Sequence, residues 1–312
     1  MKKTILSSIL LTLSMTALMG QSLELATGVG QTIKLPMTKI ETGIDADHLY
    51  VKFICEEPQA DFLKVKYKKP QWDVFSGEAV EFSFSPYGGW PGYRFRLNPS
   101  GKFFQSFYGS PKWTSRYITS DVEIQDKSWT SAVKIPFAAL EDDAFLDIGK
   151  TGKTPFLISP NWRANFLRHR RVTGKLEAFT WSSGNSLTES GYLKLPPDLM
   201  KEFRRIALKD LKIGAVDAGT GKTMLSGIFV VPRGAPAFAG TATVLLSEDG
   251  KQKRLAEIPL KLEAGAEKAF SIPFTLQESG KRFSVNLEIV NESGRLVKAS
   301  RDLPVENPWV DF

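Results

Sequence analysis

Two short stretches decide the fold of this chain: Ala79-Val80-Glu81-Phe82-Ser83-Phe84 and Tyr93-Arg94-Phe95-Arg96-Leu97-Asn98. Apolar and polar residues alternate strictly in both stretches, which is typical of strands that face a core on one side only. The connection between them, residues 85–92, is rich in Pro and Gly, as a hairpin loop requires. The sequence therefore predicts an antiparallel strand pair whose apolar residues face a core and whose polar residues face outward.

The outward face of this strand pair carries the first candidate site. A turn centred on the Gly pair of the loop places Glu81 opposite Arg96 and Ser83 opposite Arg94, and Trp72 precedes them in the chain. Carboxylates and Arg side chains hydrogen-bond vicinal hydroxyls, while an aromatic ring covers the apolar face of a sugar. Trp72, Glu81, Arg94 and Arg96 are therefore candidates for a carbohydrate site, although alternation alone favours the alternative. The alternative is an ordinary solvated sheet face with a cross-strand ion pair.

The rest of the 312-residue chain continues the same pattern. Period-two stretches recur between Gly, Pro, Asn and Asp residues, and helical signals are few, so we predict an all-β chain of two antiparallel β-sandwich domains. The expected boundaries are residues 21–197 for the first sandwich, 198–208 for a linker with a short helix, and 209–312 for an immunoglobulin-like second sandwich. The strands expected in the second domain cover residues 211–215, 224–231, 242–246, 253–262, 269–274 and 284–290.

The N-terminus indicates export. Met1-Lys2-Lys3 and the short apolar run that follows have the form of a secretory signal peptide, with cleavage expected near Gly20. The apolar run is too short to span a bilayer comfortably. We therefore predict a protein that is secreted, periplasmic or at the cell surface, with no stable membrane span. Cys55 is the only Cys, so no internal disulfide can form, and its alternation with apolar residues predicts a buried side chain.

Charge gives little support for a nucleic-acid partner. The formal net charge of +7 is spread along the chain. The one local basic cluster is His169-Arg170-Arg171 together with Arg163 and Arg168, which is thin support for nucleic-acid binding, and we predict no such partner.

Several motifs resemble functional sites but have simpler interpretations. Ala218-Gly219-Thr220-Gly221-Lys222-Thr223 lacks the earlier Gly of a phosphate-binding loop and is followed by a strand, so we interpret it as a hairpin turn. Glu141-Asp142-Asp143 is interpreted as a solvated loop. No catalytic residue and no cofactor are predicted, and a structural calcium ion is left open. Among the Trp residues we expect Trp129, Trp162 and Trp181 to be structural, whereas Trp72, Trp90 and Trp113 lie in or beside loops, as binding platforms or lids.

Six blocks taken in order resemble the family 9 carbohydrate-binding modules and their relatives among the DOMON-like sandwiches. Tyr93-Arg94-Phe95-Arg96-Leu97-Asn98-Pro99-Ser100-Gly101 is similar to the family's Tyr-x-Phe-x-Val-Asn-x-x-Gly block. Trp129 and the eleven residues after it resemble the Trp-x-x-Glu-x-x-Ile-Pro-Phe-x-x-Leu signature, with Ala132 in place of the acid. The other blocks lie at residues 45–53, 72–84, 165–168 and 179–182. The resemblance covers about residues 40–196 and implies a β-sandwich that binds poly- or oligosaccharides.

The resemblance also implies roles for single residues. In sugar-binding members two Trp residues sandwich a terminal sugar, and Trp72 matches one of them. The second is expected between Trp181 and Tyr192, where this chain has Asn185-Ser186-Leu187. Glu81 and Arg96 match polar positions that contact the sugar. We therefore expect an exported, non-catalytic carbohydrate-binding protein. The alternatives are a secreted structural or adhesion scaffold that has lost sugar binding, and an accessory part of a glycoside hydrolase system in polysaccharide catabolism.

Overall fold

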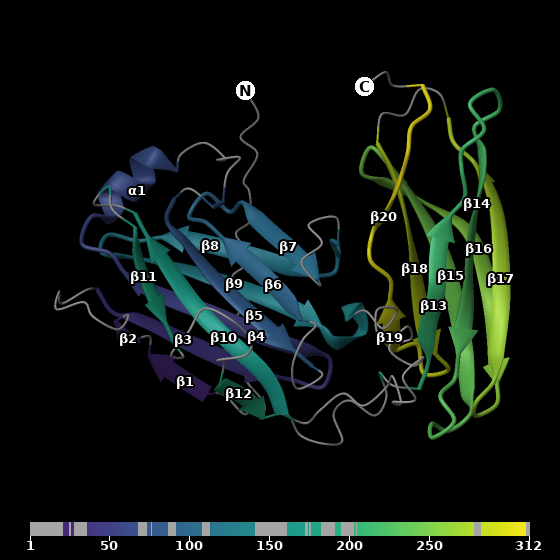
Figure 1. Ribbon diagram of the computed structural model, residues 1–312, viewed down its shortest axis with the longest axis horizontal. Helices are drawn as coiled ribbons and strands as arrows, with labels where there is room; N and C mark the ends of the chain where they lie inside the picture. Colours follow the sequence, from purple (N-terminus) through teal and green to yellow (C-terminus); the bar gives the residue numbers. More distant parts are fainter. Residues whose placement is uncertain are drawn as a thin grey trace, which may run out of the picture.

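The computed structural model describes residues 21–24, 26–27, 36–67, 74–75, 77–86, 92–107, 113–140, 161–171, 174, 176–181, 191–194, 203, 205–277 and 282–309. In this part of the chain the elements are antiparallel strands apart from one α-helix and one 3-10 turn, so the predicted all-β fold class is confirmed (Figure 1). The proposed signal peptide, residues 1–20, lies outside the described residues. None of the described helices is both long and apolar enough to cross a membrane.

The first domain consists of two antiparallel sheets, drawn in purple to teal in Figure 1. The five-stranded sheet has the order β1 (Gln21–Glu24), β3 (Thr38–Ile44), β4 (His48–Glu56), β9 (Ser128–Pro136), β8 (Thr119–Ile124). The seven-stranded sheet has the order β2 (Ala26–Thr27), β11 (Glu177–Thr180), β10 (Asn161–Arg170), β5 (Ala79–Ser85), β6 (Tyr93–Leu97), β7 (Phe103–Phe107), and β12 (Gly191–Lys194) also pairs with β10. The helix α1 (Ala60–Lys66) follows β4, and the 3-10 turn η1 (Phe137–Ala139) follows β9.

Aromatic side chains from both sheets fill the space between them. The Phe53 ring of β4 lies with its centroid 6.3 Å from that of Phe82 on β5 and 6.1 Å from that of Phe166 on β10. Trp129 and Trp162 are fully buried in the same cluster, as predicted for structural Trp residues. Trp113 was a candidate binding platform, but it is 3% exposed and packs edge-on against Tyr93, so that interpretation is wrong. A Trp in a loop can be drawn into the core because its large apolar area favours burial.

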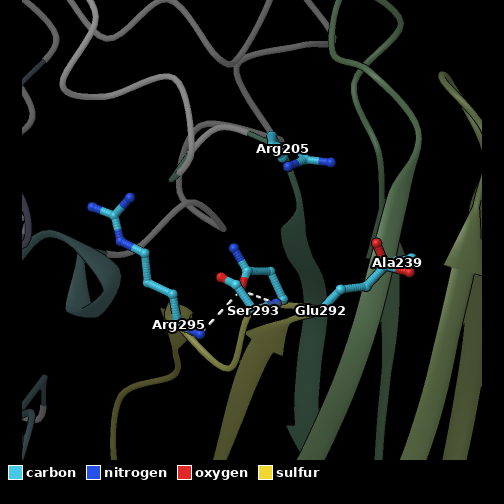
Figure 2. A pocket seen from close by; sticks show the side chains of 6 residues that line it. Arg205, Ala239, Glu292, Ser293 and Arg295 are labelled. Atoms are coloured by element: carbon cyan, nitrogen blue, oxygen red, sulfur yellow. Dashed lines mark hydrogen bonds between the residues drawn. The ribbon is translucent and has the colours of Figure 1, made fainter.

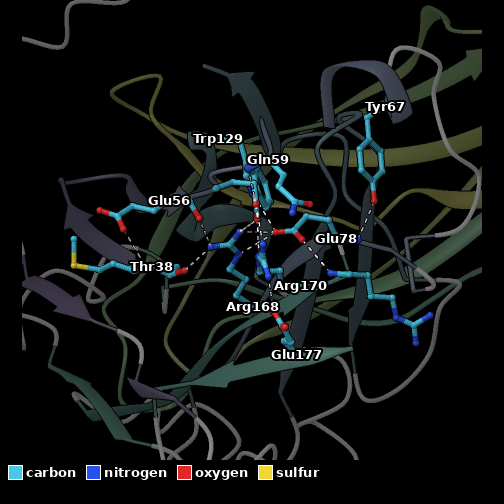
Figure 3. A network of polar contacts seen from close by, with 12 residues as sticks. Thr38, Glu56, Gln59, Tyr67, Glu78, Trp129, Arg168, Arg170 and Glu177 are labelled. Carbon is cyan, nitrogen blue, oxygen red and sulfur yellow. Dashed lines mark hydrogen bonds and ion pairs between the residues drawn. The ribbon is translucent and has the colours of Figure 1, made fainter. Parts of the chain in front are cut away.

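A network of charged side chains ties the two sheets together at one end of the sandwich (Figure 3). Arg168 of β10 is fully buried, and its Nε donates to Oε1 of Glu78 at 2.9 Å. Its Nη1 donates to the main-chain oxygen of Glu56, at the end of β4, at 2.8 Å and to Oγ1 of Thr38, at the start of β3, at 3.1 Å. One guanidinium on the seven-stranded sheet therefore bonds two strands of the five-stranded sheet.

The neighbouring Arg170 extends this network. Its Nε donates to Oε2 of Glu57 at 2.7 Å, and its Nη1 donates to Oε2 of Glu177 at 2.6 Å. Glu57 is fully buried, and its other charged partner is Arg168 at 3.0 Å. Two members of the basic cluster seen in the sequence are therefore internal ion-pair partners, because β10 turns these side chains toward the interior. Arg168 and Arg170 form no basic surface.

The second domain, drawn in green to yellow in Figure 1, also consists of two antiparallel sheets. One has the order β13 (Ala207–Ile213), β14 (Lys222–Val230), β17 (Glu267–Thr275). The other has the order β16 (Lys251–Leu262), β15 (Phe238–Glu248), β18 (Phe283–Asn291), β19 (Leu296–Ala299), and β20 (Leu303–Val305) pairs with β18. Each strand predicted in this domain overlaps an observed one. The assignment of this sandwich as immunoglobulin-like stays a prediction, as do the domain boundaries.

Two local predictions of the second half have clear outcomes. The turn before β14 contains Gly221 at φ 66°, and β14 begins at Lys222, so this segment is a turn that leads into a strand, as predicted. The predicted helix at residues 198–208 is wrong at its C-terminal end, because Ala207 and Leu208 belong to β13. Cross-strand pairing with Val230 and Phe229 of β14 satisfies their backbone groups in the sheet instead.

Polar contacts join the two domains at several points. Tyr117 of the first domain donates its hydroxyl to Glu288 of β18 at 2.6 Å. Arg295, in the turn between β18 and β19, donates from Nε to Asp47 at 2.7 Å. The buried Lys298 donates from Nζ to the main-chain oxygen of Leu140 at 3.3 Å. The two sandwiches therefore share a specific interface.

A cavity of about 420 Å³ lies beside this interface (Figure 2). It is lined by Arg205, Ala239, Asn291, Glu292, Ser293 and Arg295. The Arg295 guanidinium is bonded to the first domain through Asp47 and the main-chain oxygen of Ala46. The cationic group on this side of the cavity thus helps to hold the domains together.

Candidate functional site

The candidate site lies on the outer face of the seven-stranded sheet, the face turned away from the aromatic core. The β5–β6 pairing puts Glu81 opposite Arg96 and Ser83 opposite Arg94, so the predicted register is confirmed. Residues at alternate positions of the same strands, such as Phe82 and Phe95, lie in the core. Strict alternation in both strands therefore places the three charged side chains on one face.

Glu81 is the centre of a compact charged group on this face. Its Oε1 accepts from Nε of Arg94 at 2.6 Å, and its Oε2 accepts from Nη2 of Arg94 at 2.9 Å. Nη1 of Arg96 donates to the same Oε2 at 3.4 Å, and Nε2 of His169 on β10 lies 3.4 Å from it. We call Glu81, Arg94, Arg96 and His169 the Glu81 cluster. The paired bonds from Arg94 fix its guanidinium plane, as a bidentate contact does.

The members of this cluster differ sharply in exposure. Glu81 and Arg96 are each only 5% exposed, whereas the Arg94 side chain is 49% exposed. Burial raises the pKa of the Glu81 carboxyl, but the His169 contact, the Arg94 hydrogen bonds and their charges outweigh it and lower that pKa to about 2. Glu81 is therefore an anion at neutral pH that holds Arg94, and Arg94 is the cationic group that solvent reaches.

An exposed aromatic ring covers the two guanidinium groups. The Phe75 ring centroid lies 4.9 Å from Cζ of Arg96 and 5.9 Å from Cζ of Arg94. Phe75 also meets Phe104 of β7 edge-on, with centroids 4.9 Å apart, yet it remains 45% exposed. The main-chain oxygen of Phe75 accepts from Nη2 of Arg96 at 3.3 Å, which anchors the ring above the sheet. An exposed ring beside oriented charged donors is a suitable surface for a sugar.

A second pair of an Arg and an aromatic ring lies on the same outer face. The β10–β12 pairing puts Arg163 opposite Tyr192, and the Arg163 guanidinium carbon lies 5.4 Å from the Tyr192 ring centroid. Tyr192 is 51% exposed. Arg163 pairs across β10 and β5 with Ser85, two residues along β5 from the position that faces Arg94.

The predicted site residues therefore have different outcomes. The structure brings Glu81, Arg94 and Arg96 together, while Trp72 and Trp90 lie outside the described residues. The predicted outward face is correct, but Glu81, Ser83 and Arg96 are buried on it, so it is not the open, solvated face of the sequence-based picture. Sequence reasoning missed Phe75, Tyr192 and the contact of His169 with Glu81. Their partners are distant in the sequence, as Arg163 is from Tyr192 and Glu81 is from His169, and no local pattern predicts such contacts.

Two other candidates from the sequence have structural roles or lie elsewhere. The Cys55 thiol is fully buried, and burial raises its pKa to about 12, so it is a buried side chain as predicted and no nucleophile. Across the described ranges, no group of three or more His, Cys, Asp or Glu side chains is placed to hold a metal ion. The acidic run Glu141-Asp142-Asp143 lies outside those ranges.

Comparisons with known proteins give partial likenesses only. No family model and no curated protein matches the chain. Among solved structures, a family 9 carbohydrate-binding module from Caldicellulosiruptor kristjanssonii in complex with cellotriose matches with a TM-score of 0.37 and 11% identity, over 53% of this chain and 77% of that one. A family 9 module from the same organism in complex with glucose has a TM-score of 0.37 and 9% identity, over 55% and 84%. A β-glucuronidase from Bacteroides uniformis has a TM-score of 0.25 and 12% identity, over 82% and 26%.

Proposed function

We propose that this chain is an exported, non-catalytic carbohydrate-binding protein whose ligand lies on the outer face of the seven-stranded sheet. The observation that supports it best is the half-exposed Phe75 ring over the guanidinium groups of Arg94 and Arg96. The ring offers an apolar platform to the C–H face of a pyranose, and Arg94 offers donors to its hydroxyls. The ordered sequence blocks that resemble family 9 modules support the same function.

Binding of this kind is weak and needs no rearrangement of the ion pairs. Glu81 holds Arg94 through two hydrogen bonds, so the donor is oriented before the ligand arrives. One aromatic platform and a few charge-assisted bonds give an affinity of about micromolar to millimolar. We include Trp72 in this proposal as a further aromatic platform for the sugar, because it precedes β5 in the sequence.

Isothermal titration of the full chain with a panel of soluble glycans tests the proposal. We expect at least one glycan to bind, and Phe75→Ala to weaken that binding about threefold to tenfold, because the platform is removed. The matched control is Phe62→Ala, since Phe62 on α1 is similarly exposed and lies with its ring centroid 5.6 Å from Nζ of Lys66. The control variant is expected to bind like the unmodified chain. Absence of binding by every glycan at several millimolar would sink the proposal.

The non-catalytic part of the proposal has its own test. Incubation of the binding glycans with the chain is expected to release no new reducing ends, as measured by a reducing-sugar assay. Steady release that persists in a chain purified to constant specific activity contradicts this part and favours a polysaccharide-acting hydrolase.

One observation favours the second candidate function, a scaffold that has lost sugar binding. Glu81 and Arg96 are buried and already bond protein groups, so neither presents a large polar surface to a ligand. If this function is the correct one, Phe75→Ala, Arg94→Ala and Trp72→Ala leave every measured affinity unchanged, and any partner binds elsewhere on the chain.

A further inference from the structure

We propose that a cavity in the second domain binds a small organic acid, with the carboxylate of the ligand at Arg301 and Lys212. The cavity has a volume of about 530 Å³ and is lined by residues of β13, β14 and β17, which lie side by side in the smaller sheet, and by Arg301 (Figure 1). Small-molecule sites have volumes of roughly 300–1,000 Å³. This site is separate from the Glu81 cluster, and the inference does not depend on carbohydrate binding.

A β-bulge in β13 forms one wall of the cavity. Lys209 lies opposite Ile228 of β14, and Lys212 lies opposite Ser226, so β13 has one residue more than β14 over this interval. Asp210 in the bulge has φ 54°, a left-handed conformation that Asp adopts more readily than most residues. Bulges redirect side chains and are common beside binding sites. The bulge places Asp210 and Lys212 at the cavity, and both are exposed.

The cavity has more cationic than anionic side chains. Lys212 and Arg301 are its cations, and Asp210 is the one acidic residue that lines it. The main-chain oxygen of Arg301 accepts from Oγ of Ser300 at 2.9 Å. Within the described part of the chain, no hydrogen bond or ion pair engages the Arg301 guanidinium or the Lys212 ammonium group. Both cationic groups are therefore available to a ligand.

The backbone on both sides of Arg301 is held in place. The main-chain nitrogen of Ser300 donates to the oxygen of Leu287 on β18 at 2.8 Å. On the other side, the main-chain nitrogen of Asp302 donates to the oxygen of Thr114 in the first domain at 2.9 Å. Because these bonds fix the backbone, a ligand has only the Arg301 side chain to order, and this lowers the cost of binding.

The lining of the cavity favours an organic acid over other ligands. Guanidinium and ammonium groups bind carboxylates, and the partly buried Phe270 and Ile228 offer apolar surface to the body of the ligand. The Phe270 ring is itself supported by Phe229, with ring centroids 4.5 Å apart. The single carboxylate of Asp210 is too little for a calcium site, and two cations are too few for a nucleic-acid surface. An inorganic anion would leave the apolar surface unused.

An NMR titration of the full chain with three probes tests the proposal. The probes are benzoate, its neutral analogue benzamide, and inorganic phosphate. We expect benzoate to shift the backbone amide signals of residues 210–212 and 226–228, with a dissociation constant of about a millimolar. Benzamide and phosphate should each bind at least about fivefold more weakly, because one lacks the charge and the other lacks the apolar body.

Variants of Arg301 test the assignment of the carboxylate. Arg301→Gln should weaken benzoate binding about fivefold, and Arg301→Lys should keep part of the affinity because it keeps the charge. The matched control is Arg282→Gln, which changes an exposed Arg of the same domain that does not line the cavity. This control should bind benzoate like the unmodified chain.

Each other result overturns a stated part of the proposal. Benzamide binding as tightly as benzoate overturns the acidic ligand, and phosphate binding as tightly overturns the organic body. Benzoate that fails to saturate at 50 mM, or that shifts only signals elsewhere in the chain, overturns the site. Unchanged benzoate affinity in Arg301→Gln, with an unchanged circular dichroism spectrum, overturns the assignment to Arg301. None of these results bears on carbohydrate binding by the first domain.

Discussion

Glu81 acts at the scale of a single residue as the group that positions Arg94. Its carboxylate receives two hydrogen bonds from Arg94, one from Arg96 and a contact from His169. These partners occupy most of the acceptor positions of the two carboxylate oxygens, so few remain for a sugar hydroxyl. The family resemblance suggested a direct contact between Glu81 and the sugar, whereas the geometry favours an indirect role through the orientation of Arg94.

Replacement of Glu81 by Gln tests this role through stability. Because the folded-state pKa is about 2 and the ordinary value is 4.5, the charged form stabilises the fold above pH 4.5 and this contribution is lost as pH falls toward 2. This difference between the folded-state and ordinary pKa of Glu81 corresponds to a contribution of about 3 kcal/mol to the free energy of unfolding at pH 7. We expect Glu81→Gln to lower the free energy of unfolding by that order at pH 7 and by much less at pH 3, as measured by urea denaturation.

A matched exposed pair serves as the control for that experiment. Glu257 bonds Arg254 on the surface of the second domain, and Glu257→Gln should change the unfolding free energy by less than about 1 kcal/mol at either pH. An equal loss of stability at pH 3 and pH 7 in Glu81→Gln would show that packing, not charge, accounts for the effect.

At the scale of elements, local patterns predicted β5 and β6 but not the surroundings of β10. The register of β5 and β6 follows from alternation and one short loop, so sequence was sufficient. In β10, Arg168 and Arg170 stand at interior positions, and this hides the apolar alternation. Their partners Glu57 and Glu78 lie about a hundred residues earlier, and no local pattern reveals such pairing. The helix α1 was missed because it is short. It has seven residues, of which Ala60 and Leu63 are buried, and this is too few for a helical period of apolar residues to be recognised.

The internal charge network makes β10 sensitive to substitution. Arg168→Met should remove the hydrogen bonds to Glu78, Thr38 and the Glu56 carbonyl and leave Glu57 and Glu78 with fewer cationic partners in the interior. Breaking one side of a buried ion pair destabilises proteins by about 3–5 kcal/mol, and we expect a loss of that order in thermal or urea unfolding. Arg254→Met on the surface is the control, with an expected change below about 1 kcal/mol. A loss in Arg168→Met no larger than in the control contradicts a structural role for the network.

At the scale of the whole molecule, the sequence predicted two sandwiches but not how they meet. The hydrogen bonds between the domains, such as Tyr117 to Glu288 and Arg295 to Asp47, involve residues in turns and at loop ends. These partners are far apart in the sequence. These contacts lie away from the Glu81 cluster on β5, β6 and β10. The second domain is therefore expected to support the first one without contributing to the outer face.

Deletion of the chain after Arg205 tests this division of roles. We expect the remaining domain to bind the same glycan with an affinity within about twofold of the full chain, since no second-domain residue touches the Glu81 cluster among the described contacts. Its melting temperature should fall, because Tyr117 and Asp47 lose their partners across the interface. Loss of binding by a deletion variant that circular dichroism shows to be folded would place the site at the domain interface instead.

The most direct measurement of the central proposal is an NMR titration of the full chain that follows the Nε–Hε signals of its Arg side chains. Nε of Arg94 donates to Glu81 at 2.6 Å, so its signal reports any group that binds the same guanidinium. The prediction is that a binding glycan shifts the signal of Arg94, together with backbone signals of β5 and β6. In Phe75→Ala, a higher glycan concentration should be needed to saturate these shifts. A glycan that binds while leaving Arg94, β5 and β6 unshifted would contradict the proposed site.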